Sequence, residues 1–358
     1  MTQPVTNSGS SGFCPGITDG LALLDLARGW LAQGNPVVAS ELLGAALRTD
    51  AAKEDRSMRG RILKETGRAR MMQSQWDEAE STYSEAQCLF ADLDDLRGVS
   101  ECARNRANMS FQRGQYTQSE QLCEEALKYA SQLGDYELRA TVLNTIGAIK
   151  SATGQSLEAV KTLRLCLTDF RTAGNVLRQG YVLLNIGLTQ TELSECDEAI
   201  KSLNQALAIA LDKRDLNLVE ICYQSIAKCY LAQKETTLAR SVVDTARRIL
   251  PGLNSRALET ELNLIECRIL RLMGHTDAAL KLADQTLKMA VDHDLAALQA
   301  DLLFEQGLLY KQSGQTDLAI TKLDASINQF RAAGVERGFK EAIRALEGLK
   351  RNGNGKQQ

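Results

Sequence analysis

The sequence predicts an all-α protein, a solenoid of eight helix–turn–helix repeats followed by one further helix. Three observations support this prediction. Small residues recur every 40 residues along nearly the whole chain, a turn-forming residue lies between two of them, and apolar residues on either side of the turn recur at spacings of three and four. The last spacing is typical of amphipathic helices, and no strand-like alternation interrupts it.

Each 40-residue repeat has small residues at three fixed positions. The first series is Ala27, Gly67, Ala107, Gly147, Gly187, Ala227, Cys267 and Gly307. Twelve residues further on lie Ala39, Ala79, Ser119, Ala159, Ala199, Ala239, Ala279 and Ala319. Seven residues beyond these lie Ala46, Ala86, Ala126, Cys166, Ala206, Ala246, Thr286 and Ser326. Small side chains are needed where two helix backbones approach closely, so these positions predict the contacts inside each helix pair.

A turn signal separates the first and second small residue of each repeat. The turn residues, with Lys234 as the exception to the pattern, are Gly34, Ser74, Gly114, Gly154, Ser194, Lys234, Gly274 and Gly314. In one repeat, Leu143 and Ile146 give the helix before the turn its apolar stripe, and Ala159 and Leu163 do so after it. Each repeat is therefore expected to be a helix, a short turn and an antiparallel helix.

The two ends of the chain differ from the repeats. Residues 1–16 are rich in Ser, Gly and Pro and have no periodicity, which predicts a flexible tail. Residues 17–350 are expected to form one repeat domain. Its last segment, 336–350, is predicted to be a capping helix, because Glu347 occupies a position where the series demands a small residue. Residues 351–358 are expected to be a second flexible tail.

The charge, hydropathy and cysteine content of the sequence argue against several classes of protein. A net charge of −3 and a pI near 5.7 argue against a general nucleic-acid-binding protein. No apolar run approaches the roughly 18 residues of a membrane span, and the basic start of a secretory signal is missing, so a cytoplasmic protein is expected. Six of the nine cysteines lie in apolar helical patterns and are expected to be reduced and buried: Cys102, Cys123, Cys166, Cys222, Cys229 and Cys267.

At these residues the chain resembles the tetratricopeptide repeat, which has the same order of a small residue, a glycine and two alanines. The resemblance covers about residues 17–350 and implies a right-handed superhelical solenoid whose first helices line the concave face. Three departures are visible. The repeat has 40 residues instead of the usual 34, and the aromatic residue expected early in the first helix is mostly leucine, with Tyr223 the nearest match. The proline expected after the second helix occurs once, at Pro251.

Sites for catalysis or metal binding are not evident in the sequence. The two histidines, His275 and His293, fall in a turn and in a loop between repeats and are expected to be exposed to solvent. There is no HExxH metal site, no CxxC pair and no phosphate-binding loop in a strand–helix context. The sequence therefore predicts a protein that is not an enzyme and that holds no cofactor or metal.

The resemblance places the exposed positions of the concave face next to the first small residue of each repeat. Lys, Arg and Asn predominate there: Lys64, Arg68, Arg104, Asn105, Asn108, Asn144, Asn185, Lys228 and Arg268. Amides can pair with a peptide backbone, and Lys and Arg with carboxylates or phosphates. A peptide-binding groove and an ordinary solvated helix face both fit this pattern. Residues 53–70 hold seven basic groups against three acidic ones, which favours a partner with an acidic segment.

The expected function is a protein–protein interaction module or scaffold that holds an extended peptide or protein segment in the concave groove. Two alternatives stay open: a peptide-sensing transcription regulator, and a detached sensor or assembly segment of a larger signalling system. Regulators of the first kind usually carry a helix-turn-helix domain before the repeats, and 16 residues are too few for one.

Overall fold

The computed structural model describes residues 19–249 and 256–354, with side chains as far as residue 351. Every regular element in these ranges is a helix, and none of their residues belongs to a strand, so the all-α prediction is confirmed. The predicted tail at 1–16, the connection that contains Pro251, and residues 355–358 of the second predicted tail lie outside the described residues.

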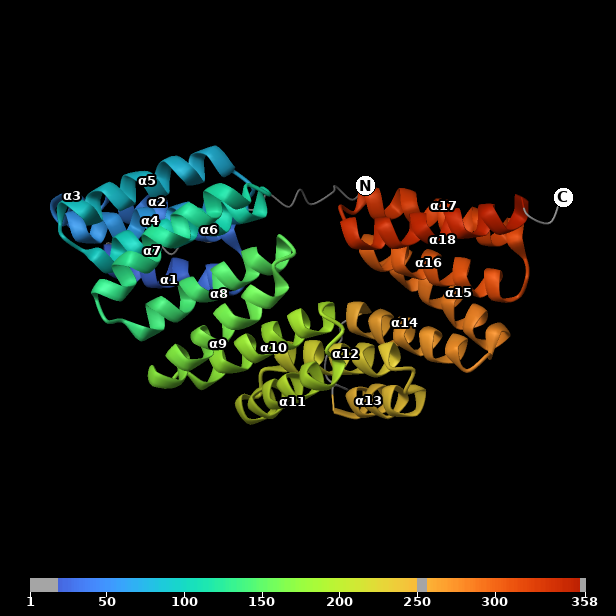
Figure 1. The fold of residues 1–358 in the computed structure, drawn as a ribbon. Helices are drawn as coiled ribbons and strands as arrows, with labels where there is room; N and C mark the ends of the chain where they lie inside the picture. The colour runs from blue at the N-terminus through green and yellow to red at the C-terminus, as the bar shows by residue number, and fades with distance from the viewer. Residues whose placement is uncertain (1–18, 250–255, 355–358) are drawn as a thin grey trace, which may run out of the picture. The chain divides into compact units, whose positions relative to one another are not determined.

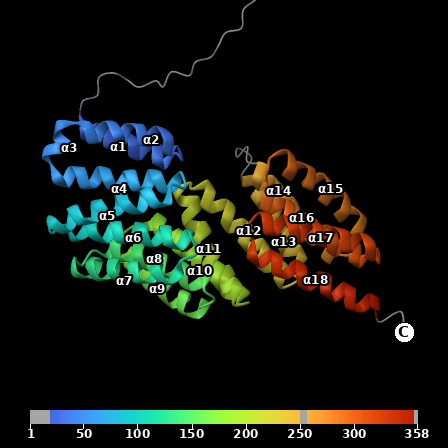
Figure 2. The ribbon, with the colours of Figure 1, turned by 90° about the horizontal axis from the view of Figure 1, so that it is seen from above.

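The contacts divide the chain into two compact units, with the boundary between Gly174 and Asn175. The N-terminal unit contains α1 (Gly20–Ala32), α2 (Pro36–Arg48), α3 (Asp50–Glu54), α4 (Arg56–Met72), α5 (Trp76–Asp92), α6 (Leu96–Gln112), α7 (Tyr116–Gln132), α8 (Tyr136–Ala152) and α9 (Ser156–Thr172). The C-terminal unit contains α10 (Val176–Glu192), α11 (Cys196–Lys213), α12 (Leu216–Ala232), α13 (Thr236–Ile249), α14 (Arg256–Leu272), α15 (Thr276–Asp292), α16 (Ala296–Gln312), α17 (Thr316–Ala332) and α18 (Glu336–Asn354). Within each unit, successive helices pack against one another in chain order (Figures 1 and 2).

The 40-residue period arises from two helices and two connections of nearly constant length. Most helices from α4 onwards have 17 residues, and three residues separate them, as at 73–75 and 93–95. One residue in most of the described connections has a positive φ, the exceptions being the connections on either side of α3. Inside the repeats these residues are Gly34, Ser74, Gly114, Gly154, Ser194, Lys234, Gly274 and Gly314. Between repeats they are Asp94, Gly134, Gly174, Arg214, Asp294 and Gly334. Lys234, the exception in the sequence pattern, thus adopts the same left-handed conformation as the glycines, with a φ of 63°.

Side-chain caps distinguish the first helices from the second helices between α5 and α12. Asp95, Asp135, Asn175 and Asp215 each accept a hydrogen bond from the backbone N–H three residues further on, at the start of α6, α8, α10 and α12. The second helices α5, α7, α9 and α11 begin after Gln or Glu without such a bond. A cap of this kind stabilises a helix by about 1 kcal/mol. The polar residues before α6, α8, α10 and α12 therefore favour the start of a helix at these positions.

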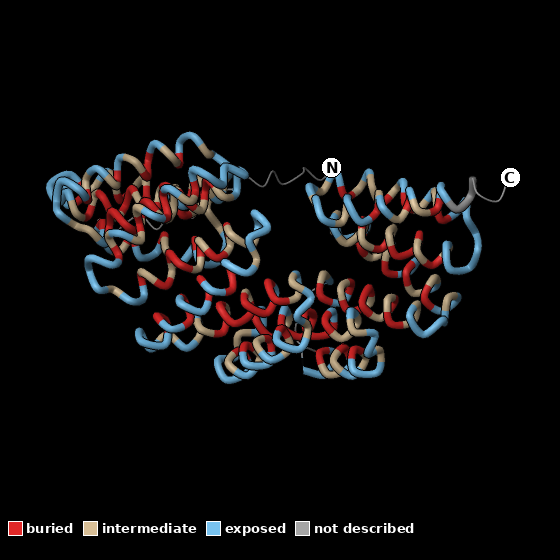
Figure 3. Tube along the Cα trace, viewed as in Figure 1, coloured by how far each residue is buried: buried red, intermediate tan, exposed pale blue. Residues whose placement is uncertain are grey.

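All three series of small residues are buried (Figure 3). A Cβ added at Gly147 would lie 2.7 Å from the side chain of Leu163, and one added at Gly187 would lie 2.6 Å from that of Leu203. In both cases the leucine belongs to the second helix of the same repeat. The prediction that small residues mark close helix–helix contacts is confirmed.

Two boundaries differ from the sequence prediction. The second helix of the first repeat is divided, because Thr49 ends α2 and its side chain caps the short helix α3 by accepting the backbone N–H of Ala52. The capping helix predicted at 336–350 is too short: α18 continues to Asn354, so residues 351–354 are helical and the second predicted tail was placed too early.

Helix α18 closes the C-terminal unit as expected of a cap. Its residues Ala342, Leu346 and Leu349 are buried against apolar side chains of α16 and α17, among them Leu323. Glu347 is exposed. No helix in the described ranges is long and apolar enough to cross a bilayer.

Candidate functional site

The first helices of successive repeats contact one another within each unit. In the N-terminal unit α4 contacts α1 and α6, and α6 contacts α8. In the C-terminal unit α12 contacts α10 and α14, and α16 contacts α14 and α18. Each second helix packs instead against the first helix of its own repeat and that of the next repeat in its unit. In a curved stack of helix pairs, the helices that contact the equivalent helices of neighbouring repeats lie on the concave side. The first helices therefore form the inner surface of each unit.

All nine residues predicted for a groove lie on first helices. In the N-terminal unit they are Lys64 and Arg68 on α4, Arg104, Asn105 and Asn108 on α6, and Asn144 on α8. In the C-terminal unit they are Asn185 on α10, Lys228 on α12 and Arg268 on α14. The predicted row is thus divided between the two units.

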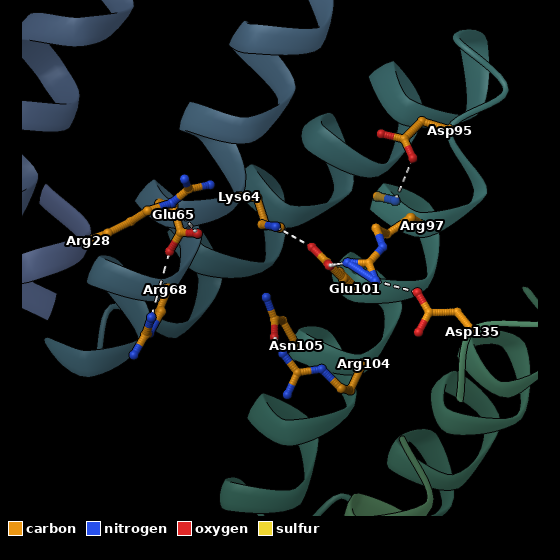
Figure 4. A network of polar contacts seen from close by, with 11 residues as sticks. Arg28, Lys64, Glu65, Arg68, Asp95, Arg97, Glu101, Arg104, Asn105 and Asp135 are labelled. Atoms are coloured by element: carbon orange, nitrogen blue, oxygen red, sulfur yellow. Dashed lines mark hydrogen bonds and ion pairs between the residues drawn. The ribbon is translucent and has the colours of Figure 1, made fainter. Parts of the chain in front are cut away.

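Ion pairs join the first helices of the N-terminal unit (Figure 4). Arg28 of α1 contacts Glu65 of α4, with 3.3 Å between Nε and Oε1. Lys64 of α4 pairs with Glu101 of α6, and Arg97 of α6 pairs with Asp135, the cap of α8. Asp135 is the N-cap residue of α8, and Arg97 is the second residue of α6. The ion pairs connect the first helices of consecutive repeats within this unit.

The remaining predicted residues of this unit also have partners within the protein. Arg68 is 45% exposed and lies 3.8 Å from Glu65. The guanidinium of Arg104 donates to Oδ1 of Asn105 at 2.7 Å, and Oδ1 of Asn108 accepts from the hydroxyl of Thr145 at 3.1 Å. Because these groups already bond to one another, a ligand would have to replace protein contacts and not only water.

The basic segment 53–70 is largely neutralised by carboxylates from neighbouring helices. Arg56 pairs with Asp92 at 2.6 Å, and Arg59 pairs with Glu85 at 3.0 Å. Both carboxylates belong to α5, outside the segment in which the charge excess was counted. The local excess of basic groups in the sequence therefore overstates the positive charge of the folded surface.

The predicted basic residues of the C-terminal unit also pair with carboxylates of neighbouring helices. Lys228 lies 3.2 Å from Glu261, and Arg268 lies 2.8 Å from Asp301 and 3.5 Å from Glu305, which is 1% exposed and also pairs with Arg271. Burial raises the pKa of Asp301, although Arg268 opposes the shift. Burial alone would lower the pKa of Arg268, but the two carboxylates outweigh it and raise that pKa. Arg268 therefore stays charged at neutral pH.

Lys228 and Arg268 line a hollow of about 1070 Å³ on the inner surface of the C-terminal unit. Leu264, Leu298 and Phe330 contribute apolar surface to it. One side is the corner between α10 and α11, residues 188–198, and the opposite side is the start of α18, residues 335–341. A hollow of this size, with apolar surface and charged side chains, can hold several residues of a peptide.

Sequence reasoning found only two residues of this hollow. It missed the carboxylates of the corner, Glu192, Glu195, Asp197 and Glu198, all of which are exposed and line the hollow. The run ELSECDE at 192–198 was the available signal, because it places four acidic groups within seven residues at a turn. No group of three or more His, Cys, Asp or Glu suited to a metal ion occurs among the described residues, and His275 and His293 are exposed.

Comparison with known proteins identifies the repeat. The tetratricopeptide repeat family model matches residues 99–172, which contain α6 to α9. No curated protein matches the sequence significantly.

Solved structures share the fold at low sequence identity. A Rap protein complexed with competence and sporulation factor is 13% identical, with a TM-score of 0.56 over 93% of this chain and 98% of that one. Aspartyl phosphate phosphatase F from Bacillus subtilis is 11% identical, with a TM-score of 0.61 over 92% and 96%. The apo form of the quorum sensor NprR from B. thuringiensis is 13% identical, with a TM-score of 0.59 over 92% and 98%. At these identities the likeness establishes a common fold.

Proposed function

We propose that this chain, whose residues 99–172 match the tetratricopeptide repeat, is a non-enzymatic interaction module that binds an extended peptide or protein segment on the inner surface formed by its first helices. The hollow of the C-terminal unit is the observation that carries the proposal. It lies on the first helices α10, α12, α14 and α16, and it combines apolar surface with fixed charges. Such a surface suits a ligand with alternating apolar and polar groups.

The comparisons support a ligand of this kind. One protein with this fold was solved with competence and sporulation factor bound, and another is named a quorum sensor. A third is named a phosphatase, so the fold by itself does not decide the activity. The proposal of a non-enzymatic role rests on the chemistry of the inner surface, where the charged residues bond to one another in structural ion pairs.

The test is a substitution that fills the hollow without touching the core. Ala232 lies exposed in the last turn of α12 and lines the hollow, so Ala232→Trp should obstruct it. Ala152, two repeats earlier at the same register, is also exposed but lies in the other unit, and Ala152→Trp serves as the matched control. The probe is a random peptide library displayed on phage, selected on the wild-type protein.

Peptides selected on the wild type should bind Ala232→Trp at least roughly tenfold more weakly, because burial of apolar peptide surface is lost. They should bind Ala152→Trp as they bind the wild type. Equal binding to all three proteins would place the interface away from the hollow. Failure to select any peptide would contradict the proposed function itself.

The N-terminal unit offers a second test of the predicted row. The triple variant Arg68→Ala, Arg104→Ala and Asn144→Ala alters its inner surface on α4, α6 and α8. A partner with an acidic segment that docks there should bind this variant more than roughly tenfold more weakly, with unchanged helicity, and binding should fall as salt rises. A partner that binds the wild type and the triple variant with the same affinity would show that this row is a solvated face.

A further inference from the structure

Two cysteines from different repeats lie next to each other at one edge of the hollow. Cys196 is the first residue of α11, is half-buried and lines the hollow. Cys229 lies in the last turn of α12 and has no exposed surface. The pair therefore spans the junction between the repeat formed by α10 and α11 and the repeat formed by α12 and α13.

Contacts on both sides of the pair hold the helices together at this junction. The hydroxyl of Thr191, in the last turn of α10, lies 3.2 Å from Sγ of Cys229. One turn further along, at the end of α12, the side-chain amide of Gln233 donates to Oδ1 of Asp197 at 2.8 Å. Asp197 directly follows Cys196 in α11. The last turn of α12 is thus held against both the end of α10 and the start of α11, with Cys196 between these two contacts in the chain.

An equivalent junction in the N-terminal unit shows that side chains at these positions meet. Two repeats earlier, the positions of Thr191, Cys196 and Cys229 are held by Phe111, Tyr116 and Ile149. The rings of Phe111 and Tyr116 lie 5.8 Å apart, and Phe111 also packs against the apolar cluster that contains Ile149. The repeat geometry therefore brings the three positions together, and in the C-terminal unit two of them carry thiols.

The two cysteines occur together at this junction and at no other. In the remaining repeats the position of Cys196 holds proline, serine, threonine or an aromatic residue, and the position of Cys229 holds an apolar residue or threonine. Burial in an apolar position explains Cys229 as a small hydrophobic residue. It does not explain a second, half-buried cysteine beside it.

The surroundings of the two thiols give them different roles. Cys196 lines the hollow, where a small solute can reach it. Burial raises the pKa of the Cys229 thiol; the hydroxyl of Thr191 opposes this shift, and the neighbouring thiol of Cys196 adds to it. Cys229 therefore reacts slowly with reagents from solvent, but it is placed to attack an oxidised sulfur at Cys196.

We propose that Cys196 and Cys229 form a reversible disulfide when hydrogen peroxide oxidises Cys196, which joins two consecutive repeats covalently at the edge of the hollow. The disulfide would close the loop of residues 196–229. Such a cross-link restricts the unfolded chain and so stabilises the folded one. This modification does not depend on whether a peptide occupies the hollow.

The oxidation takes place in two steps. Sγ of Cys196 attacks one oxygen of the peroxide, the O–O bond breaks, and the displaced hydroxide takes the thiol proton and leaves as water, so that Cys196 becomes a sulfenic acid. Sγ of Cys229 then attacks Sγ of Cys196, the S–O bond breaks, and the hydroxide takes the proton of the second thiol and leaves as water. The two thiols lose two electrons, and the peroxide is reduced to water. The second step is the slower one, because the Cys229 thiol has a raised pKa.

The test follows Cys196 in the full-length chain, in a background in which Cys14→Ser and Cys88→Ser remove two other cysteines. The protein is treated with hydrogen peroxide and denatured, the free thiols are blocked with N-ethylmaleimide, and the peptides are identified by mass spectrometry. The variants Cys196→Ser and Cys229→Ala each remove one partner. Cys222→Ala is the matched control, because it removes another buried cysteine of the same helix. Melting curves verify that the variants are folded.

The background protein should yield peptides linked between Cys196 and Cys229, a mass lower by about 2 Da, and a higher melting temperature, all reversed by dithiothreitol. Cys229→Ala should stop at a sulfenic acid that dimedone traps, Cys196→Ser should form no link, and Cys222→Ala should form the link as the background protein does.

The background protein alone can overturn the inference, whether or not a variant folds. Oxidation of Cys196 to a sulfinic acid without a link to Cys229 would do so, and so would a disulfide between Cys229 and a different cysteine. A Cys196 thiol that stays reduced while peroxide oxidises methionines of the same protein would overturn it as well.

Discussion

Gly187 in α10 should not tolerate alanine, although alanine is the better helix former. A Cβ at this position would lie 2.6 Å from Cγ and 2.8 Å from Cδ2 of Leu203, and 3.2 Å from the carbonyl oxygen of Ala199. Leu203 and Ala199 have no exposed surface. Neither neighbour can yield without displacing α11 against α10, so the added methyl group should force the two helices apart.

The expected loss of stability follows from two opposing contributions. Overpacking of a core costs roughly 1–3 kcal/mol. Replacing glycine by alanine inside a helix gains up to about 1 kcal/mol. The variant Gly187→Ala should therefore be less stable than the wild type by about 1 kcal/mol. Gly348 in α18 is a matched control in the same unit, since a Cβ there meets nothing within 4 Å, and Gly348→Ala should show only the gain.

Urea unfolding followed by circular dichroism measures both variants against the wild type. The difference between Gly187→Ala and Gly348→Ala isolates the clash. Repeating Gly187→Ala in a Leu203→Ala background provides a further control, because removal of the leucine side chain should make the added methyl group neutral or stabilising. The reasoning is refuted if Gly187→Ala raises stability as much as Gly348→Ala does.

Three further outcomes are expected. Ala159→Leu in α9 should lower the free energy of unfolding by roughly 1–3 kcal/mol or more, because the alanine is fully buried, and an unchanged urea midpoint would contradict this. Removal of α18 should lower the melting temperature and promote aggregation by exposing apolar residues of α16 and α17; a truncated chain that stays monomeric and equally stable would argue against a capping role. Burial raises the pKa of the Cys102 thiol to about 12, so at pH 8 only about one molecule in 10⁴ carries the thiolate. In a Cys14→Ser background at pH 8, Ellman's reagent should therefore react quickly with Cys88 and Cys196, and with the six buried cysteines only after unfolding. Fast reaction of more than two thiols in the folded protein would show that the packing around the buried cysteines is looser.

The sequence predicted the helix pairs because close packing restricts side-chain size directly. A position such as Gly147 is small because Leu163 approaches it closely, and the same approach recurs for Leu203 at Gly187 and Leu323 at Gly307. The left-handed residues of the connections could be predicted only in part. Glycine marks most left-handed positions inside the repeats, but Asp94 and Arg214 adopt the same conformation between repeats, and neither residue type signals it from sequence.

The candidate site could be predicted only in part. Placing Lys64 or Arg268 on a first helix required nothing beyond the repeat register. Pairing them with Glu101 or Asp301 requires the rotation and offset of one helix against the next, because the partners lie 37 and 33 residues apart in the chain. The hollow is harder still to predict, since seven helices, α10, α11, α12, α14, α16, α17 and α18, contribute to its lining, and no local sequence pattern indicates that they converge.

The equal connections described above have a consequence for how this chain can change in length. Most joints from α4 onwards in the described ranges have three residues with one left-handed residue at the centre, and the joint after α11 has two residues, of which Arg214 is left-handed. Adding or removing 40 residues between equivalent positions leaves every remaining joint with its original geometry, whereas a change of 20 residues would place a first-helix surface where a second-helix surface is required. The chain is therefore modular in steps of one whole repeat, so that the number of ligand-facing helices can be altered without redesigning the turns that hold them.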